Sequence, residues 1–209
     1  METGTTVKFS PDTPQRVVVK GYDWGMGLCT AILTLEQPAA PEAVNAGIFE
    51  QVVEERESFD WATFQPEHIV IRVPRTVRDA YICSPDGARS TQPDRYVRVE
   101  FACTPATTPA CFDLHKQRSS WCDPYHLLYT VNGETFAPPV DLNHARLPQL
   151  EPFCMEQSFT GSEDRTLQYA YYEPEEAKAA PGKKLPLVIW LHGAGEGGTN
   201  TLLPLLGNK

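Results

Sequence analysis

The residues with the clearest chemical meaning are His-Gly-Ala-Gly-Glu-Gly-Gly at positions 192–198. They directly follow residues 185–191, an apolar run typical of a central β-strand that is covered on both faces. Glycines let the main chain turn tightly and bring its N–H groups close together. Such N–H groups, fixed before the reaction, stabilise the negative oxygen that forms during acyl transfer. The pattern therefore predicts an oxyanion-binding loop after a buried strand.

Glycine-rich loops between a strand and a helix also bind phosphates, but this loop fits neither standard pattern. It lacks the lysine that a G-x-x-x-x-G-K-[ST] loop requires. A dinucleotide-binding G-x-G-x-x-G loop needs an acidic residue about 20 positions further on, which the 209 residues do not reach. A generic loop that binds a phosphate or nothing stays as the alternative.

Residues 185–198 resemble the oxyanion-loop strand of α/β-hydrolase esterases, near the branch of feruloyl esterases and polyhydroxyalkanoate depolymerases. That group also carries an immunoglobulin-like domain ahead of the hydrolase domain. The resemblance covers essentially the whole chain, strongly over 185–198 and more weakly over the β-rich part with its tract 21–25. It implies that the N–H of Ala194 is the oxyanion donor and that His192 braces the loop rather than acting as the base. The other supporting residues that it implies are Gly193 and Gly195.

The chain departs from this family at the nucleophile. A serine esterase needs a serine in G-x-S-x-G, then an acid, then a histidine. No G-x-S-x-G occurs here, no serine follows Ser162 and no histidine follows His192. An oxyanion hole alone supplies no nucleophile. The expectation is the N-terminal part of a serine carboxylic-ester hydrolase, inactive alone, whose complete form cleaves a small-molecule or polymeric ester without metal or organic cofactor.

The elements that would carry this loop begin with a series of short strands. Residues 96–103 alternate best, with Val97, Val99 and Phe101 on one face. Asn132-Gly133 predicts a hairpin turn, and 112–126 is expected as a loop with at most one helical turn. The strands are expected over residues 17–22, 28–35, 49–57, 69–73, 77–83, 96–103, 127–131 and 135–136. Such strands favour two sheets packed face to face, or a small barrel.

The chain is thus expected to be mainly β, with an incomplete α/β-hydrolase at its C-terminal end. We predict an immunoglobulin-like β-sandwich domain over 1–145, a proline-rich linker over 146–157 and an α/β-hydrolase fragment over 158–209. Within the fragment we expect a strand over 166–172, a loop or short helix over 173–184, and a helix over 199–206 capped by Thr199 or Asn200. A fragment this small is marginal alone. It must be completed by further sequence, lie against the β domain or stay mobile.

Charge and hydropathy argue against some classes of binding partner. With 18 basic and 27 acidic residues the formal charge is −9, and no basic block occurs, which argues against nucleic acid and anionic membranes. No apolar run approaches the ~18–20 residues of a membrane span, and residues 1–10 show no signal pattern. These features predict a cytoplasmic protein. The sequence does not decide whether the protein forms a homo-oligomer.

The six cysteines form no C-x-x-C pair, which argues against zinc and favours free thiols. Cys103 and Cys111 flank a Pro/Thr-rich loop and are the pair to test for a disulfide. His115 and His126 match no metal-ligand spacing, and the charged run 54–57 is expected on a solvated strand face.

A rival hypothesis is a non-enzymatic, immunoglobulin-like module that binds a protein or a glycan. Its variant is a split enzyme whose second chain brings the triad. Three tryptophans are expected in the core, with an aromatic platform for a sugar as the alternative. They are Trp24, Trp61 and Trp121.

Overall fold

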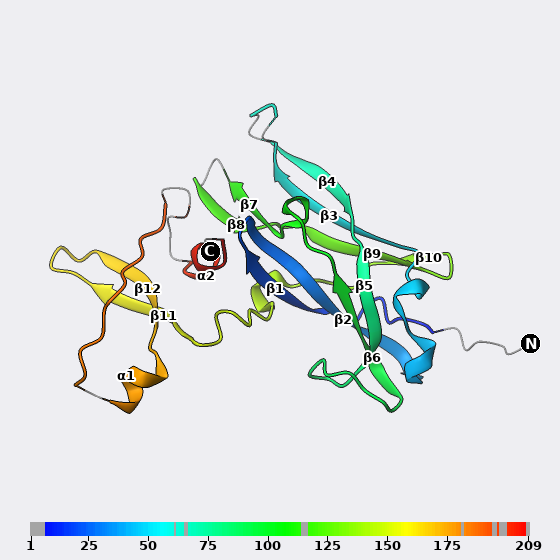
Figure 1. Ribbon diagram of the computed structural model, residues 1–209. Coiled ribbons are helices and arrows are strands. Elements are labelled where there is room, and N and C mark those ends of the chain that lie inside the picture. Colours follow the sequence, from blue (N-terminus) through cyan, green and yellow to red (C-terminus); the bar gives the residue numbers. More distant parts are fainter. Residues whose placement is uncertain are drawn as a thin grey trace, which may run out of the picture.

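The computed structural model describes residues 7–60, 62–64, 67–113, 117–180, 182–193, 196 and 200–207. Within them, the architecture is mainly β and all sheets are antiparallel (Figure 1). One four-stranded sheet has the order β1 (Arg16–Tyr22), β2 (Gly25–Ala39), β6 (Asp94–Phe101), β5 (Val77–Cys83). The other has the order β10 (Glu134–Phe136), β9 (Tyr125–Val131), β3 (Gln51–Phe59), β4 (His68–Pro74). We call these eight strands the two-sheet body.

The two sheets of this body share one hydrophobic core. Side chains alternate across a strand, and the buried positions of β6 and β9 follow that period of two. The first sheet contributes Leu28, Leu33, Val97 and Val99, and the second contributes Val52, Leu127 and Tyr129. Burying one such aliphatic side chain stabilises the fold by about 1.5–3 kcal/mol before entropy is counted. Val97, Val99 and Phe101 were predicted to share one face of a strand, and all three are buried on the same face of β6, which confirms the prediction.

The predicted strands of the two-sheet body all occur, with shifted ends. β2 is longer than expected because it continues through Pro38, where its register with β6 shifts between Thr34 and Ala39. A proline fits a strand at such an irregularity because the ladder is already interrupted there. The Asn132-Gly133 hairpin is confirmed: both residues have positive φ, 53° and 75°, as the tight turn requires.

The loop predicted over residues 112–126 is wrong, because strands occupy most of that range that the structure describes. β7 (Ala110–Asp113) and β8 (Arg118–Trp121) form a hairpin, a small separate sheet. These strands have four residues each and carry Arg-Ser-Ser at the start of β8, so no apolar alternation marks them. The short helical turns are η1 (Pro41–Ala43), η2 (Ala46–Ile48), η3 (Pro105–Thr107) and η4 (Leu142–His144).

The proline-rich stretch after β10 follows the edge of β1. Arg146 N–H donates to Val17 O at 2.9 Å, and Val19 N–H donates to Arg146 O at 3.0 Å. Leu142 and Leu150 are buried in the shared core. β11 (Phe153–Thr160) then begins inside the expected linker and pairs with β12 (Thr166–Tyr172), the predicted strand. This hairpin lies to the left of the two-sheet body in Figure 1.

The C-terminal part combines a packed helix with an unpaired apolar segment. α1 (Glu175–Ala179) is the predicted short helix, and α2 (Leu202–Gly207) is capped by Asn200, whose Oδ1 accepts from Leu202 N–H at 2.9 Å. Leu203 and Leu206 of α2 are buried in the core shared with β1 and β2. The tail therefore touches the two-sheet body, one of the expected alternatives.

The strand predicted over 185–191 is absent from the described structure. These residues have no regular secondary structure, and Leu187 and Val188 are 82% and 87% exposed. A strand needs a hydrogen-bonding neighbour, and no strand of the described residues pairs with this segment. In the same described residues, no helix has the length and apolar character to cross a membrane.

Candidate functional site

The glycine-rich loop is described at its first two residues and at Glu196. Nδ1 of His192 lies 2.8 Å from Gly193 O; because a carbonyl oxygen only accepts, this nitrogen carries the proton. Gly193 N–H donates to Glu196 Oε2 at 2.9 Å, and Glu196 N–H donates to Gly193 O at 3.0 Å. The Glu196 carboxylate therefore binds the backbone at the start of the loop, a role that was not predicted for Glu196 from the sequence.

This geometry bears on anion binding. The Gly193 N–H points at a negative oxygen, which is the charge type of an acyl-transfer intermediate. His192 and Gly193 are both exposed, so the start of the loop is open to solvent. Ala194 and Gly195, the predicted oxyanion donor and its neighbour, lie outside the described residues.

The other candidate ligands do not gather into a site. Among the described residues, no group of three or more His, Cys, Asp or Glu side chains could hold a metal ion. His126 is exposed on β9, and His115 lies outside the description. The ring of His192 contacts a backbone carbonyl oxygen, that of Gly193.

The prediction that the charged run 54–57 lies on a solvated face of β3 is wrong. Glu54 is 0% exposed and Arg56 is 5% exposed. They face inward because β3 buries alternate residues from Val52 on. Glu55 and Glu57 occupy the other face and are half-buried.

Glu54 sits between two arginines. Its Oε1 lies 2.5 Å from Arg56 Nη1, and its Oε2 lies 2.5 Å from Arg75 Nη1. Arg75 Nη2 also donates to Leu28 O on β2 at 2.6 Å, and Arg56 Nη2 donates to Ala106 O at 3.0 Å. We call Glu54, Arg56 and Arg75 the buried charge cluster; it carries one net positive charge and joins the two sheets.

Two aromatic side chains adjoin this cluster. Arg75 stacks its guanidinium 4.8 Å from the ring centre of Phe101, a cation–π contact. The Tyr125 hydroxyl is buried, and burial, with the Glu54 charge second, raises the pKa of that phenol well above its usual value. Tyr125 therefore stays neutral beside the cluster.

The cysteines are unpaired, as the sequence favoured. All six are free thiols, including Cys103 and Cys111. The Cys103 thiol donates to Leu28 O at 3.3 Å. The cysteine that acts on Cys111 is instead Cys122: a hydrogen bond between the two thiols lowers the pKa of Cys111 and raises that of Cys122. The proximity of Cys111 and Cys122 was not predicted from the sequence because the β7–β8 hairpin, which brings these two together, was not predicted.

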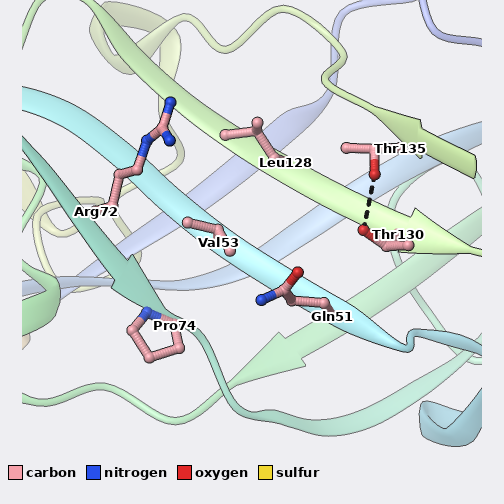
Figure 2. A pocket seen from close by; sticks show the side chains of 7 residues that line it. All are labelled: Gln51, Val53, Arg72, Pro74, Leu128, Thr130 and Thr135. Carbon is pink, nitrogen blue, oxygen red and sulfur yellow. Dashed lines mark hydrogen bonds between the residues drawn. The ribbon is translucent and has the colours of Figure 1, made fainter.

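A shallow groove lies on the outer face of the second sheet (Figure 2). Its volume is about 460 Å³. Arg72 is its one cation, and Thr130 and Thr135 share a 2.9 Å hydrogen bond at one end. The lining residues are Gln51, Val53, Arg72, Pro74, Leu128, Thr130 and Thr135. The hydroxyl, amide and guanidinium groups of the groove can form hydrogen bonds with a ligand.

The tryptophans differ from the expected core placement. Trp24 is half-buried and stacks on Tyr22, with ring centres 5.0 Å apart and planes 1° apart. It lies next to Gly25, which has φ of 128° and ends the β1–β2 turn. Trp121 is half-buried against the core, and Trp61 lies outside the described residues.

Comparison with known proteins found similarity to a solved structure. No protein-family model matches the chain, and no curated protein matches it. Among solved structures, a thermostable esterase is similar with a TM-score of 0.60 and 17% sequence identity. The match covers 93% of this chain and 51% of the esterase, so the chain spans about half the length of that protein. At this identity the similarity establishes a shared fold.

Proposed function

We propose that this chain is the N-terminal part of a serine carboxylic-ester hydrolase. The observation that carries the proposal is the fold shared with a thermostable esterase over 93% of this chain. The second support is the loop at 192–198, whose Gly193 N–H faces a carboxylate oxygen. In this proposal residues 1–145 are an immunoglobulin-like sandwich, 146–157 a linker and 158–209 the start of the α/β-hydrolase domain.

The proposed chemistry is acyl transfer through a serine outside residues 1–209. The serine attacks the ester carbonyl, the alcohol leaves, and water then hydrolyses the acyl-serine. The N–H of Ala194 and the N–H after the serine hold the oxyanion, and His192 braces the loop. The two-sheet body assists substrate access or oligomerisation.

The exposed apolar side chains of the tail support this proposal. Five consecutive residues, 187–191, are 50% to 87% exposed. The β11–β12 hairpin adds Phe159, Leu167, Tyr169, Tyr171 and Tyr172. Monomeric proteins rarely leave so much contiguous apolar surface in water. A central strand of an α/β sheet, with neighbours on both edges and helices on both faces, buries such residues.

The test is hydrolysis of short p-nitrophenyl esters by residues 1–209 and by the protein extended through the coding sequence that follows. We expect hydrolysis only by the extended protein, and its loss when the serine of a G-x-S-x-G is changed to alanine. An extension without that motif, or one that is inactive, contradicts the proposal. In the extended protein, Ala194→Pro removes one N–H and is expected to lower kcat by about 10²–10³, whereas the control Ala194→Gly keeps the donor.

The outer-face groove favours a second candidate, a module that binds a protein or a glycan. Its threonine hydroxyls, its glutamine and Arg72 are suited to hydrogen bonds with a polar ligand. Glycan-array or pull-down binding that is lost in Arg72→Ala, combined with an inactive extended protein, selects this candidate.

A further inference from the structure

The β7–β8 hairpin sets two cysteines on one face. Cys111 of β7 lies opposite Ser120 of β8, and Cys122 N–H donates to Pro109 O at 2.9 Å. Residues two apart along a strand share a face. Cys122 lies one residue beyond β8, and its hydrogen bond to Pro109 continues the ladder, so Cys122 falls on the face of Ser120 and of Cys111, as a diagonal neighbour across the hairpin. A hydrogen bond between the two thiols lowers the pKa of Cys111 and raises that of Cys122.

The two thiols differ in access. Cys122 is 2% exposed, within the core, whereas Cys111 is half-buried. A reagent from solvent can therefore reach Cys111 first. This asymmetry between an accessible sulfur and a buried partner is what a two-step thiol exchange requires.

The surroundings of Cys111 favour its thiolate. The hydrogen bond from Cys122 is the largest influence and, with the Ser120 hydroxyl and the Arg56 charge, lowers the pKa of Cys111 to about 7 against burial and the Asp113 carboxylate. Arg56 belongs to the buried charge cluster, in which two guanidinium groups share one carboxylate.

We propose that Cys111 and Cys122 are a dithiol–disulfide pair, in which Cys111 attacks a low-molecular-weight disulfide and Cys122 resolves the mixed disulfide. This site is independent of the proposed ester hydrolysis. Its co-reactant is a small disulfide of the glutathione class.

The exchange balances in two steps. The Cys111 thiolate attacks one sulfur of the small disulfide, forms a mixed disulfide and displaces one small thiolate. Cys122 then loses its proton and attacks the Cys111 sulfur, which releases the second small thiolate. The two protein sulfurs are oxidised by two electrons in total, and the small disulfide is reduced to two thiols, which take up the two protons from the protein.

The test uses the native 209-residue chain and a tryptic map. The folded protein is incubated with oxidised glutathione, blocked with N-ethylmaleimide and digested without reductant. Trypsin cuts after Lys116 and Arg118, so Cys111 and Cys122 fall in separate peptides, 99–116 and 119–146. We expect these two peptides as one linked species that a reductant separates.

Cysteine-to-serine variants identify the two sulfurs that join the linked peptides. Peptide 99–116 also contains Cys103, so Cys103→Ser is the matched control and must keep the linked species. Cys111→Ser must abolish it, and Cys122→Ser must leave glutathione attached to Cys111. The proposal is overturned if the wild-type protein gives no linked species, or if the link persists in Cys111→Ser.

Discussion

The carboxylate of Glu54 and the guanidinium of Arg75 lie 2.5 Å apart, and both side chains have 0% exposure. Glu54 belongs to the second sheet, whereas Arg75 also donates to Leu28 O in the first sheet at 2.6 Å. The pair therefore connects the two sheets through the middle of their shared core. Both groups are desolvated, so each charge compensates part of the cost of burying the other.

Glu54→Gln is expected to lower the free energy of unfolding by about 3–5 kcal/mol. Glutamine keeps the size of the side chain but leaves Arg56 and Arg75 buried without a counter-charge. Urea unfolding followed by circular dichroism measures the loss.

The matched control is Glu55→Gln, one residue along β3. Glu55 pairs with Arg72, whose side chain is 71% exposed. Exposed pairs contribute at most about 1 kcal/mol because water and salt screen them. Equal losses in the two variants would contradict the assignment of the cluster as a buried link.

Alkylation of Cys111 by iodoacetamide is expected to accelerate as pH rises through about 7 and then to level off. Its pKa is lowered to about 7, chiefly by the Cys122 hydrogen bond, and the thiolate is the reacting form. The charged and titratable groups that act on this pair are Cys111, Cys122, Asp113, Arg56 and Glu54. Peptide mapping after short labelling pulses at each pH gives the profile.

Cys83 and a variant serve as comparisons for that profile. Burial raises the pKa of Cys83 to about 11, and its side chain is 0% exposed, so it should stay unlabelled below pH 9. Cys122→Ala removes the donor and should move the Cys111 profile to higher pH. A profile that is unchanged in this variant argues against the thiol–thiol hydrogen bond.

The exposed apolar segment should govern self-association without contributing to stability. Leu187→Ser with Ile189→Ser is expected to reduce dye binding and aggregation while leaving the thermal midpoint in place, because these side chains are 82% and 74% exposed. Leu206→Ala is the contrasting change. Leu206 is 0% exposed, so its truncation should cost about 2–5 kcal/mol. Light scattering and thermal unfolding of both variants distinguish the two roles.

The sequence predicted the two-sheet body because its signals are local. Val97, Val99 and Phe101 alternate, and Asn132-Gly133 satisfies a turn that needs positive φ. These features depend on neighbours within a few residues. The β7–β8 hairpin escaped prediction because its four-residue strands carry polar residues on both faces.

The buried charge cluster could not be predicted for a different reason. Alternation identifies β3 as a strand, but charged side chains at 54–57 indicate water on both faces. Glu54 is buried because Arg75, 21 residues away, reaches it. Long-range partners of this kind leave no local pattern. Likewise, the apolar run 185–191 has the composition of a central strand, but the ladder partners that would make it one do not occur among the described residues.

The proposed function requires that this chain be part of a serine esterase whose nucleophile lies outside residues 1–209. The most direct measurement is the intact mass of the protein captured from its native cells after reaction with a fluorophosphonate, which phosphonylates activated serines. We expect a chain heavier than 23.3 kDa that carries one phosphonyl group on a serine outside these residues. A captured chain of 23.3 kDa with no phosphonyl group, and with none on any copurifying chain, would contradict it.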